Sequence, residues 1–249
     1  MPSGWPRITG NLHFRDVFMR YRDGLPLVLR GVTLNIKGGE KVGVCGRTGA
    51  GKSTLVTAIL RLVELDSGSI MIDGIETNRL GLKKLRSAIA VIPQDPVLFS
   101  GSIRTNLDPF LKYTDESIWD SIYRTRLRSC INSLDDPVEE NGQNFSVGQR
   151  QLLTIARAFL SKARIIIMDE ATASVDVETD SAIQKMIREE FLNATCLTVA
   201  HRLNTIMDSD KVLVMDNGIA SEYDTPSNLL ARTDSLFSGL VQDWEDSNN

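Results

Sequence analysis

One eight-residue segment near the start of the chain constrains the fold more than any other feature. It matches the pattern G-x-x-x-x-G-K-[ST] without a mismatch, follows the apolar run Lys41–Cys45 and precedes the helical stretch Thr54–Leu62. This order of strand, glycine-rich loop and helix predicts a phosphate-binding loop. The loop consists of Gly46, Arg47, Thr48, Gly49, Ala50, Gly51, Lys52 and Ser53.

The residue types of this loop suit the phosphate groups of a nucleotide. Glycines let backbone N–H groups turn toward phosphate oxygens, and the N-terminus of the following helix adds the positive end of its dipole. Lys52 can reach the β- and γ-phosphates, and the hydroxyl of Ser53 can bind Mg²⁺. We count Thr54, the first residue of the expected helix, among the candidate nucleotide-binding residues.

Short apolar strands alternate with helical patterns along the chain, which indicates an α/β fold with a mostly parallel sheet flanked by helices. Residues 10–37 differ, because apolar and polar residues alternate there as in half-buried antiparallel strands. The expected strands are Leu12–Phe18, Val32–Ile36, Lys41–Cys45, Ala88–Ile92, Arg164–Met168, Thr195–Ala200, Lys211–Asp216 and, after a turn at Asn217-Gly218, Ile219–Tyr223.

We expect one domain over residues 1–249 that contains an inserted helical part. Helical patterns at Asp115–Arg128 and Val147–Leu160, without strand signals between residues 96 and 162, predict a helical subdomain there. The Thr225-Pro226 pair indicates the start of a further helix. The predicted parts are residues 10–95 and 163–243 for the α/β core, residues 96–162 for the helical subdomain, and linker-like ends at residues 1–10 and 243–249.

Chemically useful side chains follow several of the predicted core strands. Gln94 comes shortly after one, Asp169 and Glu170 follow another, and His201 follows a third. Ligands of open parallel sheets bind at the carboxyl ends of the strands, so these groups are expected at one edge. Asp169 suits Mg²⁺, with Gln94 as a further oxygen ligand, and Glu170 can orient an attacking water near a γ-phosphate. His201 can donate a hydrogen bond to that phosphate.

Composition limits the remaining classes of function. The chain has 249 residues and a formal charge of −4, which argues against binding held mainly by nucleic-acid phosphates. Its three cysteines have neither metal-ligand nor disulfide spacing, which favours a reducing compartment. No apolar run approaches the roughly 20 residues that a bilayer-spanning helix needs.

The segment Phe145–Gln151, directly before a predicted helix, resembles the signature motif of ABC ATPases, usually written LSGGQ. With this match the chain resembles an ABC nucleotide-binding domain from Gly10 to about Asp243. The resemblance implies ATP as ligand and ATP hydrolysis as activity. It also implies a D-loop at Ala173–Asp176, roles for Gln94 and His201 as Q-loop and H-loop residues, and adenine stacking by Tyr21. The signature residues are Ser146, Val147, Gly148 and Gln149.

Several segments resemble the C subfamily, the multidrug-resistance-associated type, and its second nucleotide-binding domain in particular. They are Trp5-Pro6, Met19–Arg22, Val91–Phe99, Asn106–Pro109, Asn144–Gln151 and Asp169–Ser174. In that domain the family keeps the glutamate that corresponds to Glu170, so the resemblance implies competence for hydrolysis. Two departures stand out: Val147 replaces the first glycine of the general signature, and the loop around residues 134–140 is shorter than usual. The short loop puts coupling to a membrane domain in doubt more than nucleotide binding.

The resemblance also implies partners and a place in the cell. Two such domains enclose two ATP molecules head to tail, so the signature residues would contact ATP held by a second nucleotide-binding domain, in the same polypeptide or in a homodimer. Transmembrane domains would complete an exporter of organic anions, drugs or conjugates at the cytoplasmic face of a membrane. Two alternatives remain open: a nucleotide-sensing domain that gates a channel of the same subfamily, and a soluble ABC ATPase that acts on DNA or ribosomes.

Overall fold

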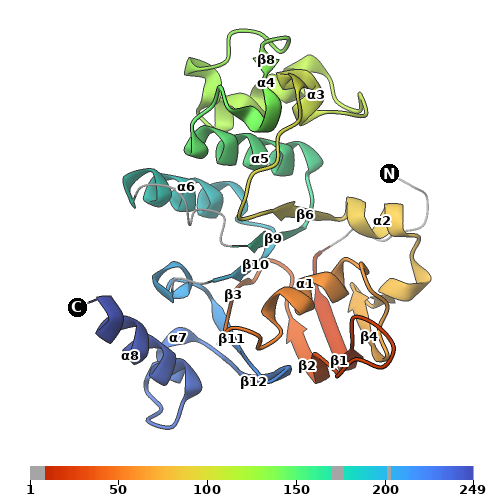
Figure 1. Cartoon of the computed structure of the whole chain (residues 1–249), viewed down its shortest axis with the longest axis vertical. Coiled ribbons are helices and arrows are strands. Elements are labelled where there is room, and N and C mark those ends of the chain that lie inside the picture. The colour runs from red at the N-terminus through yellow and green to blue at the C-terminus, as the bar shows by residue number, and fades with distance from the viewer. Residues whose placement is uncertain (1–8, 170–176, 201–202, 249) are drawn as a thin grey trace. The chain divides into compact units, whose positions relative to one another are not determined.

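The computed structural model describes residues 9–169, 177–200 and 203–248, and Figure 1 labels its helices and strands where there is room. The chain divides into two compact units. The first comprises Met1–Ile89, Arg164–Asp169 and Asn193–Asn249, and the second comprises Ala90–Ala163 and Glu170–Leu192.

The first unit contains a four-stranded antiparallel sheet in the order β2-β1-β4-β5. Its strands are β1 (Leu12–Met19), β2 (Leu29–Ile36), β4 (Ser67–Ile72) and β5 (Ile75–Glu76). Buried residues recur at alternate positions over most of β1 and β2, as expected for strands with one apolar face. The antiparallel pairing predicted for residues 10–37 is confirmed, while β4 and β5 lacked a recognised signal.

A six-stranded sheet has the order β12-β11-β3-β10-β9-β6. Its strands are β3 (Lys41–Cys45), β6 (Ile89–Ile92), β9 (Ile165–Asp169), β10 (Thr195–Val199), β11 (Lys211–Asp216) and β12 (Ile219–Asp224). The parallel strands β3, β9, β10 and β11 are nearly continuous apolar runs because both faces of the sheet are covered. Val44 and Leu197 belong to a core shared with the antiparallel sheet, whereas Cys45 and Val214 pack against Phe237 on the other face.

The turn between β11 and β12 is the predicted hairpin. Asn217 and Gly218 both have positive φ values, 47° and 80°, which is the geometry that an Asn-Gly pair adopts in a two-residue turn. The predicted cap before Pro226 is also present, since the Thr225 hydroxyl accepts a hydrogen bond from the Asn228 N–H at 3.2 Å.

The helices of the first unit cover its sheets. They are α1 (Lys52–Ile59), α2 (Leu82–Ser87), α7 (Pro226–Leu230) and α8 (Leu236–Asn248), with short 3₁₀ turns η1 (Thr77–Arg79) and η4 (Leu203–Ile206). The prediction of a linker from residue 243 is wrong, because α8 continues to Asn248. Trp244 packs against the cluster that contains Phe237, so this end of the chain buries apolar surface.

The second unit is mainly helical. It holds α3 (Ile103–Leu107), α4 (Asp115–Arg124), α5 (Val147–Ser161), α6 (Val177–Glu190), the 3₁₀ turns η2 (Leu127–Ser129) and η3 (Glu140–Gly142), and strands β7 (Gly101–Ser102) and β8 (Pro137–Val138). The helix predicted to Arg128 ends at Arg124, because Arg126 adopts a left-handed backbone with φ of 58°. The prediction that residues 96–162 contain no strands is wrong, since β7 pairs with β8.

Helix α6 belongs to the second unit, although the sequence interpretation placed residues 163–243 in the α/β core. Long-range contacts at the C-terminal end of this helix explain the difference. Glu190 forms an ion pair with Arg124 of α4, and the ring of Phe191 lies 4.9 Å from that of Phe159 of α5. Periodicity along the chain carries no information about such contacts.

Candidate phosphate-binding site

The phosphate loop connects β3 to α1, as the motif predicts. Gly46 has φ of 141°, and a Cβ at this position would lie 2.1 Å from the carbonyl oxygen of Met215. Gly51 is the N-cap of α1 with φ of 103° and offers no side chain to the helix N-terminus. Position 46 therefore requires glycine because a side chain would overlap the Met215 carbonyl, and position 51 requires it because the backbone has a positive φ. The first turn of α1 keeps its N–H groups available to an anion.

Lys52 lies inside this loop with only 8% of its surface exposed. Its Nζ donates to the carbonyl oxygens of Gly46 at 2.7 Å and Arg47 at 3.1 Å. An ammonium group has three donors, so one remains for another acceptor. Burial lowers the pKa of Lys52, and the nearby carboxylate of Asp169 opposes that shift. Among the described residues, the hydrogen-bond partners of Nζ are both neutral carbonyls, an arrangement that fits an anionic ligand.

Asp169 ends β9, which is separated by β10 from β3, the strand that leads into the loop. Across the parallel sheet, Val44 of β3 is paired with Val199 of β10, and Val199 is paired with Asp169 of β9. The three residues therefore occupy one row of the sheet at its carboxyl edge. The side chain of Asp169 is half-buried, and its charge acts on Lys52. The predicted convergence of the phosphate loop and Asp169 is thus present in the first unit.

The oxygen donors at this edge suit a hard divalent cation. Ser53, the residue after the buried Lys52, is exposed in the first turn of α1. A serine hydroxyl and an aspartate carboxylate are ligands that Mg²⁺ accepts when nucleotide phosphates and water supply the rest. No group of three or more His, Cys, Asp or Glu side chains within the described ranges could hold a metal ion by itself. The residues present therefore fit Mg²⁺ bound together with a nucleotide.

The hairpin turn after β11 supports the phosphate loop, a contact that the sequence interpretation missed. The N–H of Gly218 donates to the carbonyl of Ala50 at 3.0 Å, and the N–H of Arg30 donates to the carbonyl of Gly218 at 2.9 Å. A Cβ on Gly218 would lie 2.1 Å from the carbonyl oxygen of Val28. The glycine of this Asn-Gly pair thus serves both the turn geometry and the close approach of Val28, the residue before β2.

Tyr21 lies just after β1 and is 45% exposed. Its hydroxyl is 2.9 Å from the Thr54 hydroxyl on α1. Arg20, immediately before it, binds Asp66 through both its backbone N–H at 2.7 Å and its Nε at 2.6 Å. The structure therefore brings Tyr21 and the helix of the phosphate loop together in the first unit.

Burial around the loop also affects Cys45, the residue before Gly46. Burial raises the pKa of the Cys45 thiol to about 12, against the influence of the Lys52 charge. The Cys196 thiol is similar, with its pKa raised to about 11 mainly by burial. Because the thiolate is the nucleophilic form, both thiols are unreactive at neutral pH. Neither belongs to the chemistry of the site.

The signature residues form the start of α5 in the second unit. Ser146 is the N-cap, and its Oγ accepts the Gln149 N–H at 3.2 Å while its own N–H donates to Gln149 Oε1 at 2.9 Å. This capping box satisfies two donors at the helix N-terminus. Val147 and Gly148 lie between these residues in the first turn and are half-buried. The helix therefore starts at Val147 as predicted.

Two side chains of α5, the buried Gln151 and the half-buried Arg157, hold the segment around Gln94, a role that the sequence pattern did not predict. Gln151 donates to the carbonyl of Pro93 at 3.2 Å. Arg157 donates to the carbonyls of Val97 and Asn106, each at 2.7 Å. Gln94 itself is exposed after β6. The sequence signal that could have indicated such a role is an arginine within a largely apolar run of helix residues.

The remaining predicted residues lie outside the part of the chain that the structure describes. They are the catalytic candidates Glu170 and His201 and the D-loop segment Ala173–Asp176.

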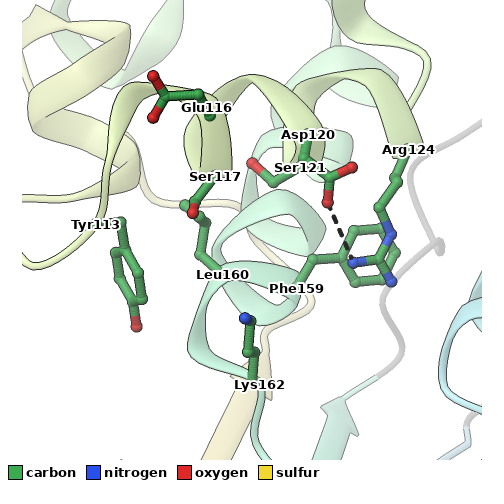
Figure 2. A pocket seen from close by; sticks show the side chains of 9 residues that line it. All are labelled: Tyr113, Glu116, Ser117, Asp120, Ser121, Arg124, Phe159, Leu160 and Lys162. Atoms are coloured by element: carbon green, nitrogen blue, oxygen red, sulfur yellow. Dashed lines mark ion pairs between the residues drawn. The ribbon is translucent and has the colours of Figure 1, made fainter.

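A cavity of about 230 Å³ lies between α4 and α5 of the second unit (Figure 2). Two of its charged groups, Arg124 and Asp120, form an ion pair at 3.7 Å; Arg124 also pairs with Glu190, and its guanidinium lies over the ring of Phe159. Lys162, which follows α5, reaches the same cavity. It contains none of the predicted site residues, so the candidate site remains at the phosphate loop.

Comparison with known proteins supports this assignment. The family model described as ABC transporter matches residues 29–173, which is more than half of the chain. The chain belongs to the ABC transporter family. A solved structure of a bacterial Atm1-family ABC exporter with ATP bound matches with a TM-score of 0.87 and 29% identity, over 94% of this chain and 41% of that one. The predicted fold class, an α/β P-loop NTPase core with an antiparallel β portion and an inserted helical subdomain, agrees with this neighbour.

Curated relatives place the chain with the C subfamily of ABC transporters. ATP-binding cassette sub-family C member 3 of Rattus norvegicus is 50% identical over 97% of this chain, and ABC transporter C family MRP4 of Zea mays is 51% identical over 98%. ABC transporter C family member 12 of Dictyostelium discoideum is 53% identical over 96%. The chain spans only 16% to 18% of the length of these relatives. It is an ATP-binding domain of this subfamily, a domain class that hydrolyses ATP.

None of the helices in the described part of the chain has both the length and the apolar character that a membrane span requires.

Proposed function

We propose that this ABC domain is the ATP-hydrolysing motor of a membrane exporter. The observation that carries the proposal is the phosphate loop, where the buried Lys52 ammonium keeps a free donor and interacts with the charge of Asp169 at the end of β9. A buried cation whose described partners are carbonyls is costly unless an anion completes its surroundings. The phosphate chain of ATP is an anion of the right chemistry.

Mg²⁺ bound with ATP would supply positive charge to the phosphate oxygens. Ser53 and Asp169 are the residues of the first unit that would hold it, with Gln94 as a further oxygen donor. Glu170 would orient and deprotonate the attacking water, and His201 would donate a hydrogen bond to the γ-phosphate.

The proposal extends to a second nucleotide-binding domain, in the same polypeptide or in a homodimer. Ser146, Gly148 and Gln149, at the start of α5, would contact ATP held by that partner, with the N-terminus of the helix facing its phosphates. Binding of two ATP molecules head to tail would close the pair, and hydrolysis would release it. The pair would lie at the cytoplasmic face of a membrane, where transmembrane domains would convert this cycle into efflux of organic anions, drugs or conjugates.

The variant Glu170→Gln tests the assignment of hydrolysis. We expect Mg-ATP binding, measured by calorimetry, to persist, while turnover falls by about 100- to 10,000-fold, the range for removal of a general base. Glu140→Gln, which removes an exposed carboxylate of η3, serves as the matched control and should keep wild-type turnover. Full turnover in Glu170→Gln would remove the role assigned to this residue.

Transport itself requires the full-length protein. Inside-out vesicles that carry it should take up a labelled glutathione conjugate only with Mg-ATP, and not with a non-hydrolysable analogue. ATP-dependent ion current without conjugate uptake would instead support the nucleotide-sensing, channel-gating alternative.

A further inference from the structure

The hydroxyls of Tyr21 and Thr54 join two parts of the first unit that are far apart in sequence. Their oxygen atoms lie 2.9 Å apart, so one hydroxyl donates to the other. Thr54 is the third residue of α1 and is 5% exposed, whereas Tyr21 keeps 45% of its surface exposed. The tip of the tyrosine is therefore held by the helix that starts at Lys52, while much of the side chain stays accessible.

The backbone on the other side of Tyr21 is also fixed. Asp66 accepts hydrogen bonds from the backbone N–H and from Nε of Arg20. The N–H of Val28 donates to the carbonyl of Met19 at 2.8 Å and so closes the loop of residues 20–27. Tyr21 is thus anchored at its backbone and at its hydroxyl. Between these anchors, the exposed ring has little freedom to move.

We propose that the Thr54 hydroxyl is a positioning group that holds the ring of Tyr21 ready for the base of the nucleotide. The inference rests on the proposed function, in which Tyr21 stacks on adenine. A ring fixed before binding loses less conformational entropy when the base stacks on it. Because Thr54 and Lys52 share the first turn of α1, one helix positions both the Tyr21 ring that stacks on the base and the ammonium group that binds the phosphates.

This role predicts that Thr54 acts on the base and not on the phosphates. We therefore compare two probes by calorimetry with Mg²⁺ present: ATP and inorganic tripolyphosphate, which lacks a base. Thr54→Val keeps the shape of the side chain without its hydroxyl, and Tyr21→Phe keeps the ring without its hydroxyl. Each should weaken ATP binding about threefold to tenfold, the value of one hydrogen bond, and leave tripolyphosphate binding unchanged.

Three further variants make the test specific to the pair. Thr54→Ser retains the hydroxyl and should bind ATP as the wild type does. The double variant Tyr21→Phe with Thr54→Val should bind ATP no more weakly than either single variant, because both remove the same hydrogen bond. Thr57→Val makes the same substitution one turn later, where the hydroxyl donates to the Ser53 carbonyl, and should leave the preference for ATP over tripolyphosphate unchanged.

Two results would overturn the inference. One is equal weakening of ATP and tripolyphosphate in Thr54→Val, which would assign its hydroxyl to the phosphates. The other is wild-type ATP affinity in Tyr21→Phe, a change at an exposed side chain that leaves the core intact. Failure of the proposed function looks different: the wild-type chain would then bind neither probe, or would bind ATP no better than tripolyphosphate.

Discussion

Helices α1 and α5 both begin at segments that the sequence predicts to contact phosphate, yet their N-termini are built differently. Helix α1 follows Gly51, which has no side chain and a positive φ. Helix α5 follows Ser146, which exchanges two hydrogen bonds with Gln149. The first helix leaves its N–H groups to a ligand, while the second satisfies part of its own N-terminus.

The difference shows how one element, a helix N-terminus, suits two tasks. Around α1 the buried Lys52 supplies a charge and glycines supply room, so the site is organised for an anion held by the same chain. Around α5 the capping box keeps the helix start ordered by itself. Ser146 Oγ and Gln149 Oε1 are the acceptors of that box, so the Ser146 hydroxyl proton and the Gln149 side-chain NH2 remain as donors for a nucleotide of another domain.

The largest expected effect comes from removing the charge at α1. Lys52→Ala should weaken Mg-ATP binding on the order of 100-fold, because it deletes charged hydrogen bonds to the β- and γ-phosphates. Calorimetry measures the change, and Lys83→Ala on the exposed side of α2 is the control for loss of one positive charge. If both variants bound Mg-ATP equally well, α1 would not differ from an ordinary helix start.

The next effect concerns the glycines of the loop. Gly46→Ala should destabilise the chain by about 2–3 kcal/mol, because its Cβ would overlap the Met215 carbonyl. Gly49→Ala is the matched comparison: with φ of 81° and open space around it, the expected cost is only the backbone strain of about 1 kcal/mol. Urea denaturation measures both, and the reverse order of stabilities would contradict the described loop geometry.

The smallest effect is expected at α5. Ser146→Ala removes the side-chain cap and should lower the free energy of unfolding by about 1 kcal/mol. Ser146→Asp keeps an acceptor at the N-cap and should retain most of the stability. Thermal or urea denaturation distinguishes the two. Equal stability of Ser146→Ala and the wild type would mean that the capping box contributes nothing to the helix.

Local patterns were sufficient for elements that depend on neighbouring residues. The phosphate loop, the strand that ends at Asp169, the Asn217-Gly218 turn and the cap at Thr225 were all predictable, because each rests on a backbone preference or an apolar run. The tail after residue 243 was misassigned as a linker, since its helix depends on apolar contacts with the core that no local pattern displays.

The parts of the site that could not be predicted are contacts between distant segments. The support of Ala50 by Gly218, the hydroxyl pair of Tyr21 and Thr54, and the hold of Arg157 on Val97 each join residues that are at least 33 positions apart. The grouping of α6 with α4 and α5 is of the same kind.

The sequence by itself determined the chemistry of this protein, because a glycine-rich loop between strand and helix, followed by an acid at another strand end, has few uses other than binding a nucleotide. Only the tertiary structure decided how that chemistry is held in place. Hydrogen bonds between remote segments depend on the path of the chain in space, and a linear pattern of residues does not contain that path.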